Sequence, residues 1–106
     1  MKNDKIIFIY TTFPNKKSAE KLIEKILKNR LAACLNYWPI FSQYLWNKKI
    51  EKSNEWALII KTVKKNYQKI EKLIKKYHPY EIPAILSWPM TKGEKNYWKW
   101  LINEIK

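Results

Sequence analysis

The chain has 106 residues, the length of a single domain over 1–106, and its balance of 46% hydrophobic and 29% charged residues excludes an intrinsically disordered protein. No apolar run approaches the roughly 20 residues of a membrane-spanning helix, so no membrane partner is predicted. The net charge of +13 comes almost entirely from lysine and admits two interpretations, an acidic partner such as nucleic acid or a compositional bias.

A strand and a helix are predicted at the start of the chain. The stretch KIIFIYTT (5–12) is β-branched and aromatic, which indicates a buried strand. Beyond FPN the hydrophobic period changes, and Asn15 is a residue type suited to cap a helix. We expect this helix to fade around Asn29 and to bury one face formed by Ala19, Leu22, Ile23, Ile26 and Leu27.

A long hairpin follows, formed by predicted strands 31–46 and 47–63. Asn47 tolerates the left-handed conformation that the turn needs, and Pro39, which cannot donate to a ladder, marks a bulge or an edge strand. A strand of about 15 residues extends about 50 Å. Since a compact domain of about 100 residues has a radius of gyration of about 13 Å, the hairpin must protrude or bend at Pro39.

The far part of this hairpin is apolar and aromatic. Its large side chains are Tyr37, Trp38, Phe41, Tyr44, Leu45 and Trp46. A patch of this kind is rarely left in water on a soluble monomer. The hairpin either folds back over its own sheet or contacts another subunit. We expect a subunit contact, because the helices already cover one face of the sheet.

A helix, a short strand and a terminal helix complete the predicted fold. The second helix buries Tyr67, Ile70, Leu73, Ile74 and Tyr77 and ends before Pro79, because a residue preceding proline disfavours the α conformation. A strand is expected at 82–90, and Gly93 precedes a third helix with Tyr97, Trp98, Leu101, Ile102 and Ile105 facing inward. The order β-α-β-β-α-β with an extra C-terminal helix predicts an α+β fold, the ferredoxin-like sandwich.

Four stretches in this order resemble the CutA divalent-cation tolerance family. They are RLAACLN (30–36), the aromatic hairpin around YLW (44–46) with IIKT (59–62), YHPYEIP (77–83) and YWKWL (97–101). They span nearly the whole chain, and HPYE followed by a short strand is the most specific of them. The chain departs from the family pattern at Ala84, where glutamate is usual, and at Thr11, where some members have cysteine.

The resemblance implies a homotrimer of ferredoxin-like subunits, similar in architecture to the PII signalling proteins. It also implies a role in metal tolerance or signalling, with copper or another divalent cation as the expected ligand. No enzymatic activity is expected, because no nucleophile with a defined partner is visible and Arg30 lies at a helix end instead of in a phosphate loop. The start MKNDK and the single cysteine, Cys34, predict a cytoplasmic location.

The candidate metal ligands are Cys34, His78 and Glu81. His78, the only histidine, has three interpretations. As an imidazolium at the helix end it caps free carbonyls and is stabilised by the helix dipole. Alternatively it binds a metal, with Glu81 as an oxygen donor or supporting partner, or it is a general base oriented by Glu81. Cys34 is either a small core residue or a thiolate ligand for a soft metal.

A cleft between subunits is also expected from the matching stretches, lined by Trp46, Lys61 and Tyr80. A single glycine, Gly93, cannot build a phosphate-binding loop, so nucleotide binding is not expected. The lysines are scattered over every element, which favours compositional bias over a nucleic-acid partner. The alternative function is a basic anion- or nucleic-acid-binding module of the same fold with no metal role.

Overall fold

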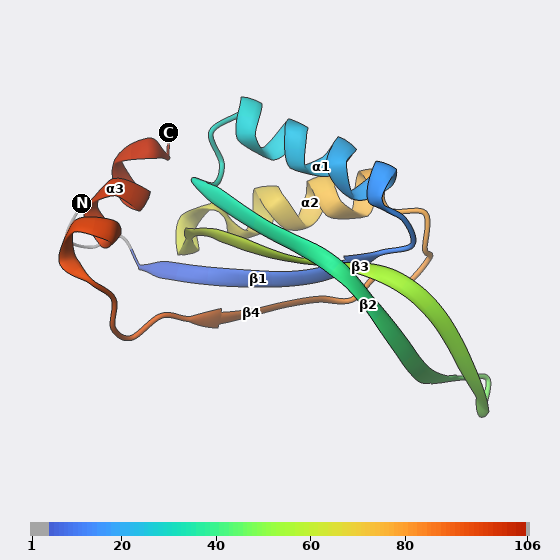
Figure 1. Ribbon diagram of the computed structural model, residues 1–106. Helices are drawn as coiled ribbons and strands as arrows, with labels where there is room; N and C mark the ends of the chain where they lie inside the picture. Colours follow the sequence, from blue (N-terminus) through green and yellow to red (C-terminus); the bar gives the residue numbers. More distant parts are fainter. Residues whose placement is uncertain (1–4, 106) are drawn as a thin grey trace.

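The computed structural model describes residues 5–105, so residues 1–4 of the MKNDK start lie outside it. The elements follow the predicted order: β1 (Ile6–Phe13), α1 (Lys16–Lys28), β2 (Cys34–Trp46), β3 (Lys49–Val63), a 3-10 turn (Lys64–Asn66), α2 (Tyr67–Tyr77), β4 (Ile85–Pro89) and α3 (Lys95–Glu104). The strands form one antiparallel sheet in the order β2-β3-β1-β4, and α1 and α2 lie on one face of it (Figure 1). This is the predicted α+β sandwich of the ferredoxin-like type.

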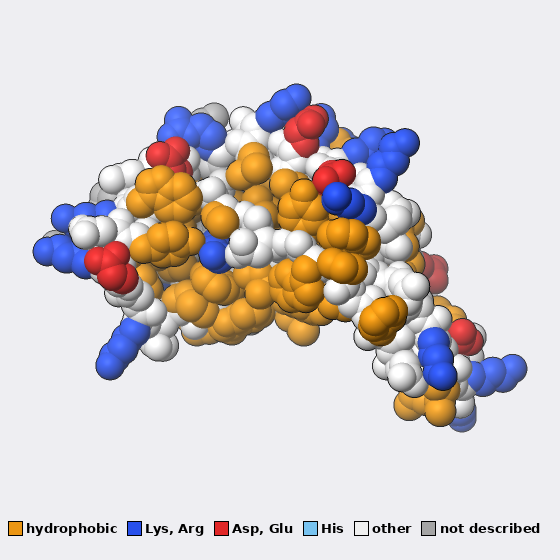
Figure 2. Space-filling model, in the orientation of Figure 1, with side chains coloured by type: hydrophobic (Ala, Val, Ile, Leu, Met, Phe, Trp, Pro, Cys, Tyr) orange, Lys and Arg blue, Asp and Glu red, His pale blue; other side chains and the backbone are white. Residues whose placement is uncertain are grey.

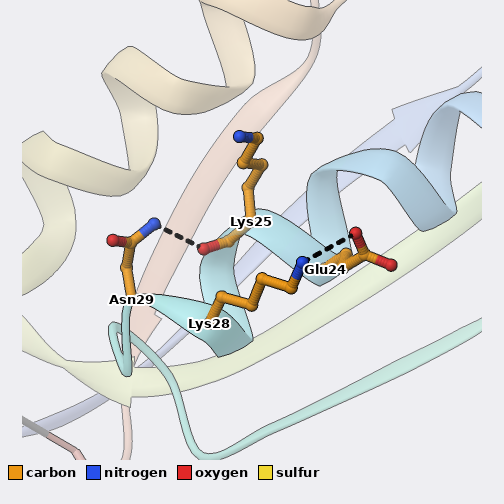
Figure 3. A network of polar contacts seen from close by, with 4 residues as sticks. All are labelled: Glu24, Lys25, Lys28 and Asn29. Atoms are coloured by element: carbon orange, nitrogen blue, oxygen red, sulfur yellow. Dashed lines mark hydrogen bonds and ion pairs between the residues drawn. The ribbon is translucent and has the colours of Figure 1, made fainter.

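Side-chain caps define both ends of α1. Asn15 is the N-cap, as predicted, because its side-chain oxygen accepts a backbone N–H of the first turn at 2.8 Å. At the other end the Asn29 side-chain amide donates to the carbonyl of Lys25 at 2.8 Å, beside an ion pair between Lys28 and Glu24 (Figure 3). This ion pair is solvent-exposed and contributes at most about 0.5 kcal/mol. The caps and the buried face therefore determine where the helix lies.

Both strands of the hairpin begin later than predicted, because residues in the left-handed conformation precede them. Arg30 has a φ of 52°, and the chain does not become extended in β2 until Cys34. Asn47 and Lys48 have φ values of 52° and 64°, so both form the turn and β3 begins at Lys49. The left-handed turn predicted at Asn47 is confirmed.

The main core lies between the two helices and the sheet. Its fully buried side chains include Ile9, Phe13, Leu22, Ile26, Leu58, Ile60, Ile70 and Ile74. Two predictions about buried faces are wrong, since Leu27 is 44% exposed and Tyr97 is 42% exposed. Leu27 lies at the margin of its helical stripe. Tyr97 faces outward, where its hydroxyl accepts a hydrogen bond from the ammonium of Lys61 at 3.2 Å.

The second face of the sheet is only partly covered. At one end α3 packs on Ile6 and Val63 through Leu101 and Ile102. No other described helix lies on this face, and strand alternation turns a row of apolar side chains toward it: Phe8, Tyr10, Trp38, Ile59, Leu86 and Trp88. We call this surface the open sheet face. Figure 2 shows hydrophobic side chains gathered below the helices, with basic side chains mainly around the rim.

The hairpin of β2 and β3 extends well beyond the rest of the sheet (Figure 1), giving the molecule a long axis of 46 Å. The two strands pair without interruption over the whole length of β2. Pro39 lies in this edge strand, so the edge alternative is correct and the bulge is not. The hairpin does not fold back over its own sheet, since Phe41 is 90% exposed. Within residues 5–105, no helix has the length and apolarity to cross a membrane.

Candidate functional site

His78 joins α2 to the body of the sheet. Pro79 ends α2 as predicted, and His78 leaves the helix with extended backbone. Its imidazole is only 8% exposed and lies 4.3 Å from the ring of Phe13, between ring centroids. The ring nitrogen Nε2 lies 2.5 Å from the carbonyl oxygen of Thr12, and Nδ1 accepts the backbone N–H of Tyr80 at 3.0 Å. Both ring nitrogens are therefore used within the fold.

These contacts assign the neutral form of His78 with the proton on Nε2, because a carbonyl can only accept. Burial lowers the pKa of His78, and this effect exceeds the opposing effects of the hydrogen bond to Thr12 and the negative charge of Glu55. The interpretation as a charged cap of helical carbonyls is therefore wrong, since the ring is neutral and bonds to β1. To bind a metal or act as a base, His78 would have to give up one of its two hydrogen bonds.

The loop at 79–84 is held against the sheet by a buried carboxylate. Glu55, on β3, is 7% exposed, and its Oε2 accepts hydrogen bonds from the Tyr80 hydroxyl at 3.1 Å and from the Thr12 hydroxyl at 3.4 Å. Burial, together with this hydrogen bond and the charge of Glu55, raises the pKa of Tyr80 to about 12. Because residues 79–84 form this packed loop, the strand predicted at 82–90 is shortened to β4.

A hollow of about 1010 Å³ lies between this loop and the protruding hairpin. Its aromatic wall contains Tyr10, Tyr44, Trp46 and Tyr80, and its carboxylates are Glu51, Glu55 and Glu81. The predicted cleft residues Trp46 and Tyr80 thus line one hollow, together with the predicted ligand Glu81. Ligand pockets in proteins commonly have volumes of this order.

Lys61 and Cys34 lie at the other end of the hairpin. They are cross-strand partners, and the Lys61 ammonium lies over the rings of Phe8 and Tyr97, at 5.7 Å and 5.5 Å from the ring centroids. Lys61 is six residues from Glu55 along β3, a separation of about 20 Å in an extended strand. A single chain therefore does not place Lys61 in the hollow. Its meeting with Trp46 and Tyr80 across a subunit boundary stays a prediction.

One chain does not supply a set of donors that fits a metal ion. Among residues 5–105, no group of three or more His, Cys, Asp or Glu side chains could hold one. Cys34 is partly exposed at one end of the sheet, whereas Glu81 lines the hollow at the other. His78 offers no free nitrogen, as described above. Any metal site built from the three predicted ligands therefore needs more than one chain.

Glu55 was not predicted from the sequence. Its alternation within β3 shows only that it shares a sheet face with Ala57 and Ile59. Its contact with Tyr80 depends on how the loop after α2 folds back onto the sheet, and no local pattern specifies this. An acidic residue in an otherwise apolar stretch such as EWALII was the one available signal.

Solved structures with this fold share both the architecture and a family. The chain superposes on the periplasmic divalent cation tolerance protein CutA from Archaeoglobus fulgidus with a TM-score of 0.92 and 34% identity, covering 95% of this chain and 99% of that one. It superposes on CutA1 from Oryza sativa with a TM-score of 0.92 and 34% identity, covering 96% and 94% of the two chains. These neighbours define a class of small ferredoxin-like proteins.

The chain belongs to the CutA1 divalent ion tolerance protein family, whose model matches residues 7–104. Among its relatives is the divalent-cation tolerance protein CutA of Pyrococcus horikoshii, 41% identical over 101 residues, which are 95% of this chain and 99% of the relative. The CutA protein of Thermotoga maritima is 38% identical over 96 residues, or 91% and 95% of the two chains. The family resemblance seen in the sequence is therefore confirmed.

Proposed function

We propose that the chain is a cytoplasmic, non-enzymatic homotrimer with a PII-like arrangement that binds copper or another divalent metal ion in metal tolerance or signalling. A general role in divalent-cation tolerance follows from the names of its relatives. The observation that carries the assembly is the open sheet face, together with the exposed aromatic hairpin. Support for a cytoplasmic location is the single cysteine, which excludes an internal disulfide.

The homotrimer is supported by two apolar surfaces on one chain. The open sheet face exposes Leu86 and Trp88, and the hairpin exposes Phe41, Leu45 and Trp46. Contiguous apolar surfaces of this kind mark interaction sites in soluble proteins. Two different surfaces on one chain allow head-to-tail contacts between identical subunits, and such contacts close into a ring when the rotation per subunit divides the circle.

Metal binding is proposed as a property of the assembly. One chain offers too few donors, but a trimer triples the number of copies of each. Cys34 begins β2 on the same sheet face as Phe8, the face proposed to pack between subunits. Its thiolate suits Cu(I) and Zn²⁺. Glu81 adds a carboxylate from the hollow, and His78 contributes only if one of its hydrogen bonds opens.

Titration with Cu(I) under reducing conditions and with Zn²⁺ tests this proposal. The wild-type protein is expected to bind at least one of them, and Cys34→Ala to weaken that binding by at least about tenfold, since a donor is lost. His78→Ala and Glu81→Gln are measured in parallel. Glu24→Gln, which alters an exposed carboxylate on α1, is the control and should bind like the wild type. Unchanged stoichiometry and affinity in both Cys34→Ala and His78→Ala would reject the site.

A further inference from the structure

The hollow between the hairpin and the loop at 79–84 has the opposite charge to the rest of the protein. The chain carries 22 lysine and arginine residues against 9 acidic ones. None of the residues that line the hollow is basic, while three of them are glutamates: Glu51, Glu55 and Glu81. Its remaining wall is largely aromatic and aliphatic, with Tyr10, Tyr44, Trp46 and Tyr80 as the largest side chains bearing a polar atom.

Glu55 is a buried carboxylate without a cation. It is only 7% exposed, yet the donors that reach it are the neutral hydroxyls of Tyr80 and Thr12, and both bind the same oxygen, Oε2. In the described part of the chain the one ion pair is between Lys28 and Glu24. A buried charge is costly unless it is paired and hydrogen-bonded. Among residues 5–105, no hydrogen bond is made to the second oxygen of Glu55, Oε1.

We propose that this hollow binds a small organic cation carrying a primary ammonium group. An ammonium N–H donates to the free oxygen of Glu55 and supplies the positive charge that the buried carboxylate lacks. Aromatic rings attract a cation placed over their faces, and Tyr44, Trp46 and Tyr80 surround the site. The alkyl part of the ligand lies against the apolar lining, which includes Ile40 and Phe41.

An ammonium ion fits this lining better than a bare metal ion. The three glutamates do not converge into a group that could hold a metal, whereas an ammonium needs only one carboxylate and an aromatic wall. The inference is independent of the proposed metal function, because it uses neither Cys34 nor a metal. Its failure would leave the metal proposal standing.

The test uses n-butylamine hydrochloride as the probe, titrated calorimetrically into the full chain in its native assembly after treatment with a chelator. The ammonium ion is expected to bind, and n-butanol, its neutral counterpart, to bind at least about tenfold more weakly. Glu55→Gln keeps the shape of the side chain and removes its charge, so it should weaken n-butylammonium binding at least about tenfold. Glu24→Gln, with its exposed carboxylate on α1, should bind like the wild type.

A second variant keeps the proposal testable if Glu55→Gln does not fold. Tyr80→Phe retains the aromatic ring but removes the hydroxyl that donates to Glu55, so it should bind n-butylammonium at least as tightly as the wild type. Cys34→Ala should leave amine binding unchanged. The proposal is overturned if the wild type does not bind the amine, including the case in which a lysine of another subunit already fills the hollow. Equal binding of n-butanol, or full binding by folded Glu55→Gln, overturns it as well.

Discussion

Replacing Leu86 with aspartate is expected to convert the proposed trimer into monomers. Leu86 is 62% exposed in the middle of the open sheet face, as the cross-strand partner of Tyr10. Its position in β4 leaves it free of the core, so the single chain tolerates a polar side chain there. In a subunit contact the same carboxylate would be buried without a partner, at a cost of several kcal/mol. Sedimentation velocity at micromolar concentration measures the change.

The matched control for this variant is Leu27→Asp. Leu27 is also a half-exposed leucine, but it lies on α1, on the other side of the molecule from the open sheet face. The control should keep the sedimentation coefficient of the wild type. A Leu86→Asp protein that sediments with the wild type would show that the open sheet face is not the subunit contact.

Replacing His78 with alanine is expected to lower the free energy of unfolding by roughly 2–5 kcal/mol. The substitution leaves the Thr12 carbonyl and the Tyr80 N–H without partners and opens a space beside the ring of Phe13. Urea denaturation at one fixed protein concentration measures the change, since assembly makes stability depend on concentration. His78→Gln should recover part of the loss, because its amide can donate to the Thr12 carbonyl. A His78→Ala protein as stable as the wild type would contradict the structural role.

The pH dependence separates this role of His78 from simple packing. Burial lowers the pKa of His78 in the folded protein below its ordinary value of 6.5, so below that value the unfolded chain binds a proton that the folded chain excludes. The contribution of His78 to stability is therefore complete above pH 6.5 and declines as the pH falls toward the folded pKa. The difference in stability between wild type and His78→Ala should shrink on going from about pH 8 to about pH 5.

Most of the fold could be predicted because it is encoded locally. The helical stripe after Asn15 and the proline at Pro79 fix the extents of α1 and α2, and both predictions are confirmed. The length of the hairpin against the size of the domain predicted its protrusion, which Figure 1 shows. The strand ends were less accurate, because the left-handed conformations of Arg30 and Lys48 carry no glycine or other strong signal in the sequence.

The candidate site could be predicted only in part, because it depends on contacts between distant segments. Trp46, Tyr80 and Glu81 lie around one hollow as their shared motif stretches suggested. Lys61 lies elsewhere in the chain because the register of β2 with β3 places it beside Cys34, far along the strand from the loop. Neither the burial of Glu55 nor the double hydrogen bonding of His78 follows from residue type or spacing.

Sedimentation equilibrium of the wild-type chain at micromolar concentration tests the proposed homotrimer most directly. Formation of the trimer would bury the open sheet face and the aromatic hairpin, which the single chain leaves in water. We predict one species with three times the 13.0 kDa mass of a single chain. A clean monomer of 13.0 kDa at that concentration would contradict the homotrimer, and with it the metal site proposed between its subunits.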